Sequence, residues 1–177
     1  MPQNKYKDIR PRRETIRPIG PSIAYIELNH GQYALIDYED ALNLSEYLWS
    51  ALFQKSSGNY VPRTSMRGRP AIMSHMVLGR PPAGMMVDHI NHNTLDNRAC
   101  NLRFATPAQN RANSVIERNK TIPLKGVFQC PYSGRYGAAI CVEGKQIGLG
   151  RYDTPEAAHA AYVAKAKEVY GEFACSG

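Results

Sequence analysis

The sequence predicts an α+β protein in two parts, and three observations support this. Residues 85–116 show the order strand, loop, strand and helix. Residues 126–170 show three short strand-like runs followed by one alanine-rich helix. A polar linker, residues 117–124, separates the two patterns. We therefore expect a basic flexible tail at 1–21, a first domain at 22–116 and a second at 125–173.

The composition excludes several classes of protein. A length of 177 residues with 43% hydrophobic content suits one or two small folded domains and not a disordered chain. No run of about 18 apolar residues is present, and the N-terminus is too polar for a secretory signal. The four cysteines form no C-x-x-C pair, which argues against structural zinc and suits reduced thiols in a cytoplasm.

Charge is distributed unevenly along the chain. The formal net charge is +7 in total, +4 for residues 1–21, −4 for 22–59, +6 for 60–122 and +1 for 123–177. A polyanionic partner such as nucleic acid is therefore expected to contact the tail and the middle of the chain, and to avoid residues 22–59.

The first domain begins with short predicted elements. IAYIEL and QYALID, on either side of Asn29-His30-Gly31, are typical of a β-hairpin. Helical spacing of leucines predicts a helix within Tyr38–Leu52. An extended piece is expected at Tyr60–Thr64 and a short helix at Ala71–Leu78.

The strand–loop–strand–helix stretch has clearer signals. Met85–Ile90 is expected to form a strand that carries Asp88 and His89 near its end, and Asn101–Phe104 a second strand. Thr106-Pro107-Ala108-Gln109 is a strong helix start, with Thr as the N-cap, Pro at the first helical position and Gln three residues after the cap. This helix is expected to run from Pro107 to about Ile116.

The second domain is predicted to be a three-stranded antiparallel sheet with one helix. Strands are expected at Gly126–Cys130, Tyr136–Val142 and Lys145–Tyr152, joined by hairpin turns that contain glycine. Thr154-Pro155-Glu156 repeats the capping signal, and the helix is expected to continue to Tyr170 before Gly171 ends it.

Residues 88–110 read DHINHNTLDNRACNLRFATPAQN. This run resembles the HNH nucleases, in the subset whose third motif residue is Asn and which includes many phage homing endonucleases. The resemblance covers roughly His75 to Ser114. It implies a ββα-metal fold, hydrolysis of double-stranded DNA, a divalent cofactor that is most simply Mg²⁺, with Mn²⁺ as an alternative, and a phage-infected or bacterial cell.

The chemistry of the motif residues agrees with this resemblance. A single Mg²⁺-like ion needs only one or two protein oxygens, because water and phosphate complete its shell. Asp88 offers a carboxylate oxygen and Asn110 an amide oxygen, so these two are the expected metal ligands. The unperturbed pKa of histidine, about 6.5, suits His89 as the general base. The resemblance implies that Asn101 holds the histidine loop.

Other polar residues near the motif have less certain roles. His75 either supports the site, contacts phosphate or is structural. Asp96 is expected in the loop and His92 exposed, although either is close enough in sequence to approach a metal. Three arginines are candidates for phosphate contact, Arg98 being the least certain: Arg98, Arg103 and Arg111.

Residues 125–173 resemble the plant ethylene-response-factor (apetala-type) DNA-binding domain. The resemblance rests on K-G-V, R-Y-G-A-A-I, L-G-R-Y and T-P-E-A-A-H-A-A-Y. It implies a sheet that enters the DNA major groove. The residues expected to contact DNA there are Lys125, Arg135, Tyr136, Lys145 and Arg151. Tyr136 stands where the plant domains usually have Trp, and the plant domains carry more arginines on the sheet. A sheet used for protein contact is the alternative.

Three functional alternatives remain open at this point. A non-catalytic DNA-binding regulator would keep the hairpin as a scaffold, but would not need Asp88, His89 and Asn110 together. A structured-RNA binder would prefer RNA over duplex DNA in competition. A nuclease used for defence or packaging would share the same site. One site cuts one strand, so a monomer is expected to nick, whereas a double-strand break needs a homodimer or two events.

Overall fold

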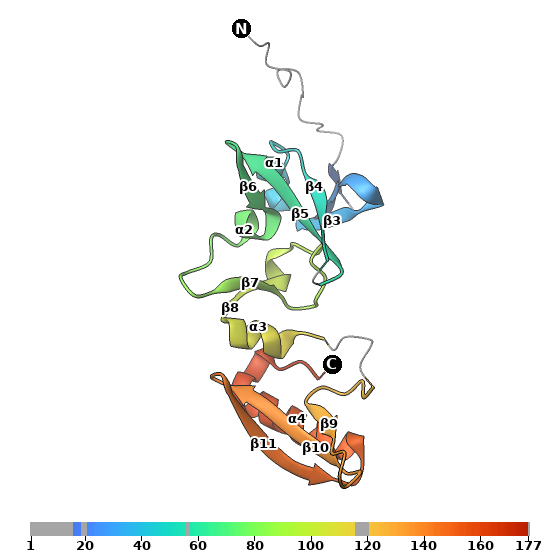
Figure 1. Cartoon of the computed structure of the whole chain (residues 1–177). Helices are drawn as coiled ribbons and strands as arrows, with labels where there is room; N and C mark the ends of the chain where they lie inside the picture. The colour runs from blue at the N-terminus through green and yellow to red at the C-terminus, as the bar shows by residue number, and fades with distance from the viewer. Residues whose placement is uncertain (1–15, 19–20, 56, 116–120, 177) are drawn as a thin grey trace. The chain divides into compact units, whose positions relative to one another are not determined.

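A computed structural model of the chain describes residues 16–18, 21–55, 57–115 and 121–176 (Figure 1). The chain forms two compact units. One contains the described residues up to Pro82 together with Asn93–Arg103, and the other contains Ala83–His92 and the residues from Phe104 onward. None of the helices in these described ranges is long and apolar enough to cross a membrane. The expected tail, residues 1–21, lies mostly outside the description.

The first unit begins with an antiparallel sheet in the order β1-β2-β3. Its strands are β1 (Ile16–Pro18), β2 (Ile23–Glu27) and β3 (Tyr33–Asp37). The 3₁₀ turn η2 (Asn29–Gly31) joins β2 to β3, which confirms the predicted hairpin. His30 and Gly31 both have positive φ there, so the glycine provides the backbone freedom that this tight connection needs.

A second antiparallel sheet follows, in the order β4-β5-β6. Its strands are β4 (Ser50–Gln54), β5 (Asn59–Met66) and β6 (Arg69–Ile72). The predicted helix over Tyr38–Leu52 is wrong for most of its length. Only the 3₁₀ turn η3 (Tyr38–Asp40) and the single-turn helix α1 (Ala41–Leu44) form, because Ser50–Gln54 pairs instead with β5. The predicted helix at Ala71–Leu78 appears as α2 (Met73–Val77).

The core of the first unit lies between these elements. It contains buried aliphatic residues of β2, β3 and α1, including Ile26, Ile36 and Leu44, with Met73 of α2. The segment Asn93–Arg103 is attached to β3 by main-chain hydrogen bonds, from the N–H of Leu35 to the oxygen of Leu95 and from the N–H of Asn97 to the oxygen of Leu35, both 2.8 Å. These bonds form an isolated parallel bridge between Leu35 and Asp96, which attaches the loop to β3.

The C-terminal part of the second unit matches the sequence prediction. Strands β9 (Val127–Gln129), β10 (Tyr136–Val142) and β11 (Lys145–Tyr152) form an antiparallel sheet in the order β11-β10-β9, with helix α4 (Pro155–Tyr170) and the 3₁₀ turn η5 (Gly171–Phe173) after it (Figure 1). Ile140 of β10 packs against Tyr162 and Ala166 of α4. A Cβ at Gly126 would lie 2.0 Å from the Tyr162 ring, so only glycine fits there.

Candidate active site

The candidate site is built on three short elements. Strand β7 (Met86–His89) pairs with β8 (Leu102–Ala105) in a two-stranded sheet. The 3₁₀ turn η4 (Ala99–Asn101) precedes β8, and helix α3 (Pro107–Asn113) follows it. The predicted order of strand, loop, strand and helix is therefore present, with Asp88 and His89 at the end of β7.

Local sequence determines where α3 begins. The Thr106 hydroxyl accepts a hydrogen bond from the Gln109 N–H at 3.3 Å, and the Gln109 side chain accepts one from the Thr106 N–H at 2.8 Å. This is the capping box that the sequence predicted, with Pro107 at the first helical position. The helix ends at Asn113, earlier than the predicted Ile116, because Ser114 is already extended (φ −64°, ψ 146°).

Asp88 is buried, with 4% of its surface exposed. The Asn113 amide nitrogen lies 3.0 Å from each of its two carboxylate oxygens. Asn113 is itself buried, and sequence reasoning missed it. The available signal was its position three residues after Asn110, because residues three apart share a face of an α-helix.

His89 is half-buried and opens a tight turn. Its main-chain oxygen accepts a hydrogen bond from the His92 N–H at 3.0 Å and another from the Asn113 amide at 3.1 Å. His92 has a positive φ of 65°, a conformation in which histidine is more common than most non-glycine residues. The expectation that His92 is exposed is wrong, since it is half-buried and its Nε2 lies 3.2 Å from Asn113 Oδ1.

Asn110 is half-buried on α3. The contact between Asn113 and Asp88 shows which face of α3 is turned toward β7, and Asn110 lies on that face one turn earlier, with an expected Cβ separation from Asn113 of about 5–6 Å. A carboxylate and an amide oxygen are hard donors, which fit Mg²⁺ or Mn²⁺ better than softer metals. A carboxylate has roughly four lone-pair positions, so a carboxylate that accepts hydrogen bonds from an amide can also bind a metal ion.

No group of three or more His, Cys, Asp or Glu side chains suited to a metal occurs among the described residues. A site that combines one carboxylate with an amide oxygen would not form such a group. The donor chemistry of Asp88 and Asn110 therefore carries the argument for a cation.

Asn101 belongs to the first unit and is buried. Its amide donates a hydrogen bond to the main-chain oxygen of Asp96 at 2.8 Å, so it holds the loop that follows the histidine. Asp96 lies in the loop, as expected, but it is buried, and its carboxylate accepts two hydrogen bonds of 2.7 Å from Arg98. This bidentate contact raises the pKa of Arg98 further above its usual range and occupies the guanidinium that we considered for phosphate.

The other basic candidates near the motif differ in exposure. Arg111 is exposed on α3, whereas Arg103 is half-buried in β8. His75 is half-buried in α2, and burial together with the nearby Arg80 lowers its pKa. Of these, Arg111 is the one most open to a ligand from solvent.

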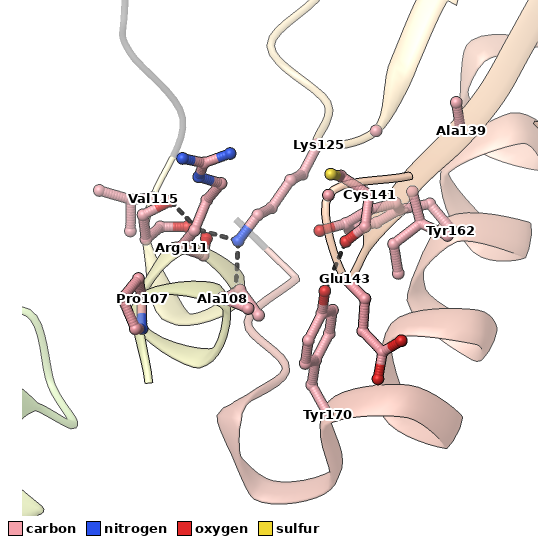
Figure 2. Close-up of a pocket in the computed structure, with 15 residues that line it drawn as sticks. Pro107, Ala108, Arg111, Val115, Lys125, Ala139, Cys141, Glu143, Tyr162 and Tyr170 are labelled. Atoms are coloured by element: carbon pink, nitrogen blue, oxygen red, sulfur yellow. Dashed lines mark hydrogen bonds between the residues drawn. The ribbon is translucent and has the colours of Figure 1, made fainter. Parts of the chain in front are cut away.

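Lys125 has a structural use in the protein. Its ammonium donates hydrogen bonds to the main-chain oxygens of Ala112 and Ser114 at the C-terminal end of α3 (Figure 2). Burial lowers its pKa. The amine that the sequence assigned to DNA thus caps the negative end of a helix dipole.

A pocket of about 640 Å³ surrounds this contact (Figure 2). On its α3 side, Ala108, Arg111 and Ala112 lie on one face of the helix, and Val115 lines the pocket from just beyond the helix end. Asn110 and Asn113 lie on the opposite face at 100° per residue. Helix α3 therefore presents one face to the β7 motif and the other to the C-terminal sheet and α4.

The remaining candidates on the C-terminal sheet are distributed over both of its faces. Register aligns Phe128, Gly137 and Arg151 on the face opposite buried Ala138, and a Cβ at Gly137 would lie 2.4 Å from the Phe128 ring. Tyr136 is two residues from Ala138 on β10, so both side chains lie on the face of the sheet that α4 covers. Phe128 instead lies on the open face. The predicted DNA contacts there remain predictions.

The charges on this sheet are in part already paired. Arg135 lies 2.8 Å from Asp153 in an exposed ion pair. Lys145 and Arg151 are exposed. Exposed ion pairs contribute little to stability and exchange readily for other partners.

Comparison with known proteins identifies a family in the same part of the chain. Residues 72–112 match the family described as HNH endonuclease. The chain is 32% identical over 158 residues to an uncharacterized HNH endonuclease of Acanthamoeba polyphaga mimivirus, an alignment that covers 86% of this chain and 80% of the relative. It is 31% identical over 96 residues to Protein 3.8 of Escherichia phage T7, covering 54% of this chain and 78% of the relative. No solved structure matches the chain.

Proposed function

Because this chain belongs to the HNH endonucleases and is therefore a phosphodiester hydrolase, we propose that it is a homing-type enzyme that cuts double-stranded DNA at a long recognition site. One observation carries the mechanism. Asp88 and His89 end β7, and Asn113 of α3 contacts the carboxylate of the first and the main chain of the second. Asn113 thus holds Asp88 and the main chain of His89 together.

The residues of the site have distinct tasks in this proposal. His89 takes a proton from the attacking water, and Asp88 and Asn110 would hold a divalent ion, Mg²⁺ or Mn²⁺. Such an ion, when bound, would supply charge neutralisation at the phosphate and at the leaving oxygen. Asn101 holds the loop after His89 through the main chain of Asp96.

The charge of the first unit supports a DNA partner. Residues 47–87 contain five basic residues and no aspartate or glutamate. Three of the five lie on the β5–β6 hairpin, where Arg63, Arg67 and Arg69 are all exposed. The acidic residues of this unit that the structure describes instead lie in β2, β3 and the segment up to Glu46, or are paired like Asp96. A two-stranded ribbon with arginines is a shape that the major groove accepts.

The C-terminal sheet is proposed as a second DNA-binding element, similar to the apetala-type domains, in a protein that acts in the cytoplasm of a bacterial or phage-infected cell. Arg151 beside Phe128 on the open face is the arrangement that supports this, since arginine is the commonest reader of guanine. Two DNA-binding elements in one chain agree with a long recognition site.

The test is conversion of supercoiled plasmid in Mg²⁺. We expect open circles in Mg²⁺, none in EDTA, and loss of cutting in His89→Ala and Asp88→Asn, with His30→Asn as a matched control at an exposed histidine. Direct linearisation would instead indicate a homodimer. Cleavage that survives in both site variants would overturn the assignment. If the plasmid is bound but not cut, DNA from an intron-insertion locus of the host decides between a rare target and a non-catalytic regulator.

A further inference from the structure

Asn113 is not one of the predicted motif residues, yet it makes hydrogen bonds to Asp88, His89 and His92. Its amide nitrogen carries two hydrogens and faces three acceptors: both oxygens of Asp88 at 3.0 Å and the main-chain oxygen of His89 at 3.1 Å. A carboxylate and a carbonyl can only accept, which places the Asn113 nitrogen on this side and its oxygen on the other. The orientation of the amide therefore follows from its partners.

His92 completes the arrangement on the far side of the amide. The Asn113 oxygen lies 3.2 Å from His92 Nε2, and since a carbonyl oxygen accepts, that nitrogen must carry the hydrogen. The His92 main chain is held as well, through its N–H bond to the His89 oxygen. His92 adopts a positive φ of 65° in this turn, a conformation of higher energy that surrounding contacts must maintain.

The bonds to both oxygens matter for the geometry of Asp88. The Asn113 amide nitrogen contacts both oxygens of the buried carboxylate and so holds the end of the Asp88 side chain in place. Charge-assisted bonds of this kind are about twice as strong as neutral ones. The same amide also donates a hydrogen bond to the main-chain oxygen of His89. The orientation of the Asp88 carboxylate and the position of the His89 backbone are therefore coupled.

We propose that Asn113 is a positioning residue that holds the Asp88 carboxylate and the His89 backbone in one fixed geometry, and that His92 orients its amide. This inference deepens the proposed function and rests on it, because it concerns how the expected metal ligand and general base are prepared for their tasks. It adds two residues to the site, neither of which touches the reacting atoms.

The first test is a change of Asn113 alone. Asn113→Leu keeps the size of the side chain and removes every hydrogen bond. Binding of Mn²⁺ alone to the full chain, measured by calorimetry, is expected to weaken about tenfold to a hundredfold, the usual effect of removing a group that orients a metal ligand. Single-turnover cleavage at saturating Mn²⁺ is expected to slow while DNA affinity in EDTA stays unchanged. Asn97→Leu is the matched control, because Asn97 is also fully buried and holds a loop, so it loses stability without losing Mn²⁺ affinity.

The second test uses His92, which is half-buried and provides a second variant where Asn113→Leu fails to fold. His92→Phe removes the donor and is expected to weaken Mn²⁺ binding by a smaller factor, whereas His92→Gln retains an N–H donor and is expected to recover most of it. If His92 acts only through Asn113, the double variant with Asn113→Leu is no worse than Asn113→Leu alone.

The outcomes separate the two levels of the proposal. Wild-type Mn²⁺ affinity and rate in Asn113→Leu, or in His92→Phe if the former does not fold, overturn the positioning role while leaving the nuclease intact. Fully additive losses in the double variant overturn the link through His92. A wild-type protein that neither binds Mn²⁺ nor cuts DNA overturns the proposed function and the positioning role together.

Discussion

The ammonium of Lys125 donates a hydrogen bond to the main-chain oxygen of Ala112, in the last turn of α3. The residue begins the C-terminal domain in sequence, yet its side chain completes a helix of the motif. A cation at the C-terminal end of a helix meets the negative end of the dipole and carbonyl groups that lack an intrahelical partner.

Lys125→Met is therefore expected to lower stability more than DNA affinity. The helix end loses a charged donor to two carbonyls, which should reduce the free energy of unfolding by about 1–2 kcal/mol. Urea unfolding measures this loss. The salt dependence of DNA binding should stay at the wild-type slope, whereas Arg151→Ala should reduce it. A lower slope in Lys125→Met with unchanged stability would show that the lysine contacts DNA, as the sequence predicts.

The β5–β6 hairpin gives a prediction about salt dependence. Each phosphate contact contributes about 0.9 to the slope of log K against log salt for duplex DNA. Changing Arg63, Arg67 and Arg69 to alanine should therefore lower the slope by up to about 2.7 if all three contact phosphate. Fluorescence anisotropy between low and moderate salt measures this. Lys165→Ala removes a cation already paired with Glu168 and should leave the slope unchanged.

Arg98 provides a prediction about the loop. Arg98→Met removes the bidentate partner of Asp96, whose side chain is only 5% exposed, and leaves that carboxylate with fewer donors. We expect a loss of about 1–3 kcal/mol in the free energy of unfolding, from the cost of a buried group with unmade hydrogen bonds. Affinity for DNA in EDTA should not change, and a drop there without a loss of stability would show that Arg98 contacts phosphate after all.

His75 makes stability depend on pH. Its pKa is lowered in the folded protein, first by burial and then by Arg80, so the unfolded chain binds more protons in this range. Its contribution is complete above the unfolded pKa of about 6.5 and is lost as pH falls through that value and the folded pKa. The free energy of unfolding should decrease less between pH 7.5 and 5.5 in His75→Gln than in wild type. Equal decreases would contradict this assignment.

Local sequence was sufficient for elements whose signals lie within a few residues. Thr106 and Gln109 cap α3 with contacts three residues apart, and Thr154 caps α4 in the same way. The strands of the C-terminal sheet, from Val127 to Tyr152, were predicted from short β-rich runs and from the glycine-containing turns between them. The motif Asp88, His89, Asn101 and Asn110 could also be found, because its residue types and spacing are specific together.

Pairing and burial between distant segments were decided by the tertiary structure. Leucine spacing predicted a helix through Leu52, but hydrogen bonding to β5 made Ser50–Gln54 a strand, which no local preference reveals. The contact of Asn113 with Asp88 spans 25 residues, and the burial of Asp96 depends on its place beside β3. Sequence predicted which groups carry the chemistry of the proposed function. Only the tertiary structure determined which side chains hold these groups in place. The hydrogen-bond partners of buried polar atoms can lie far away in sequence, and packing brings them together.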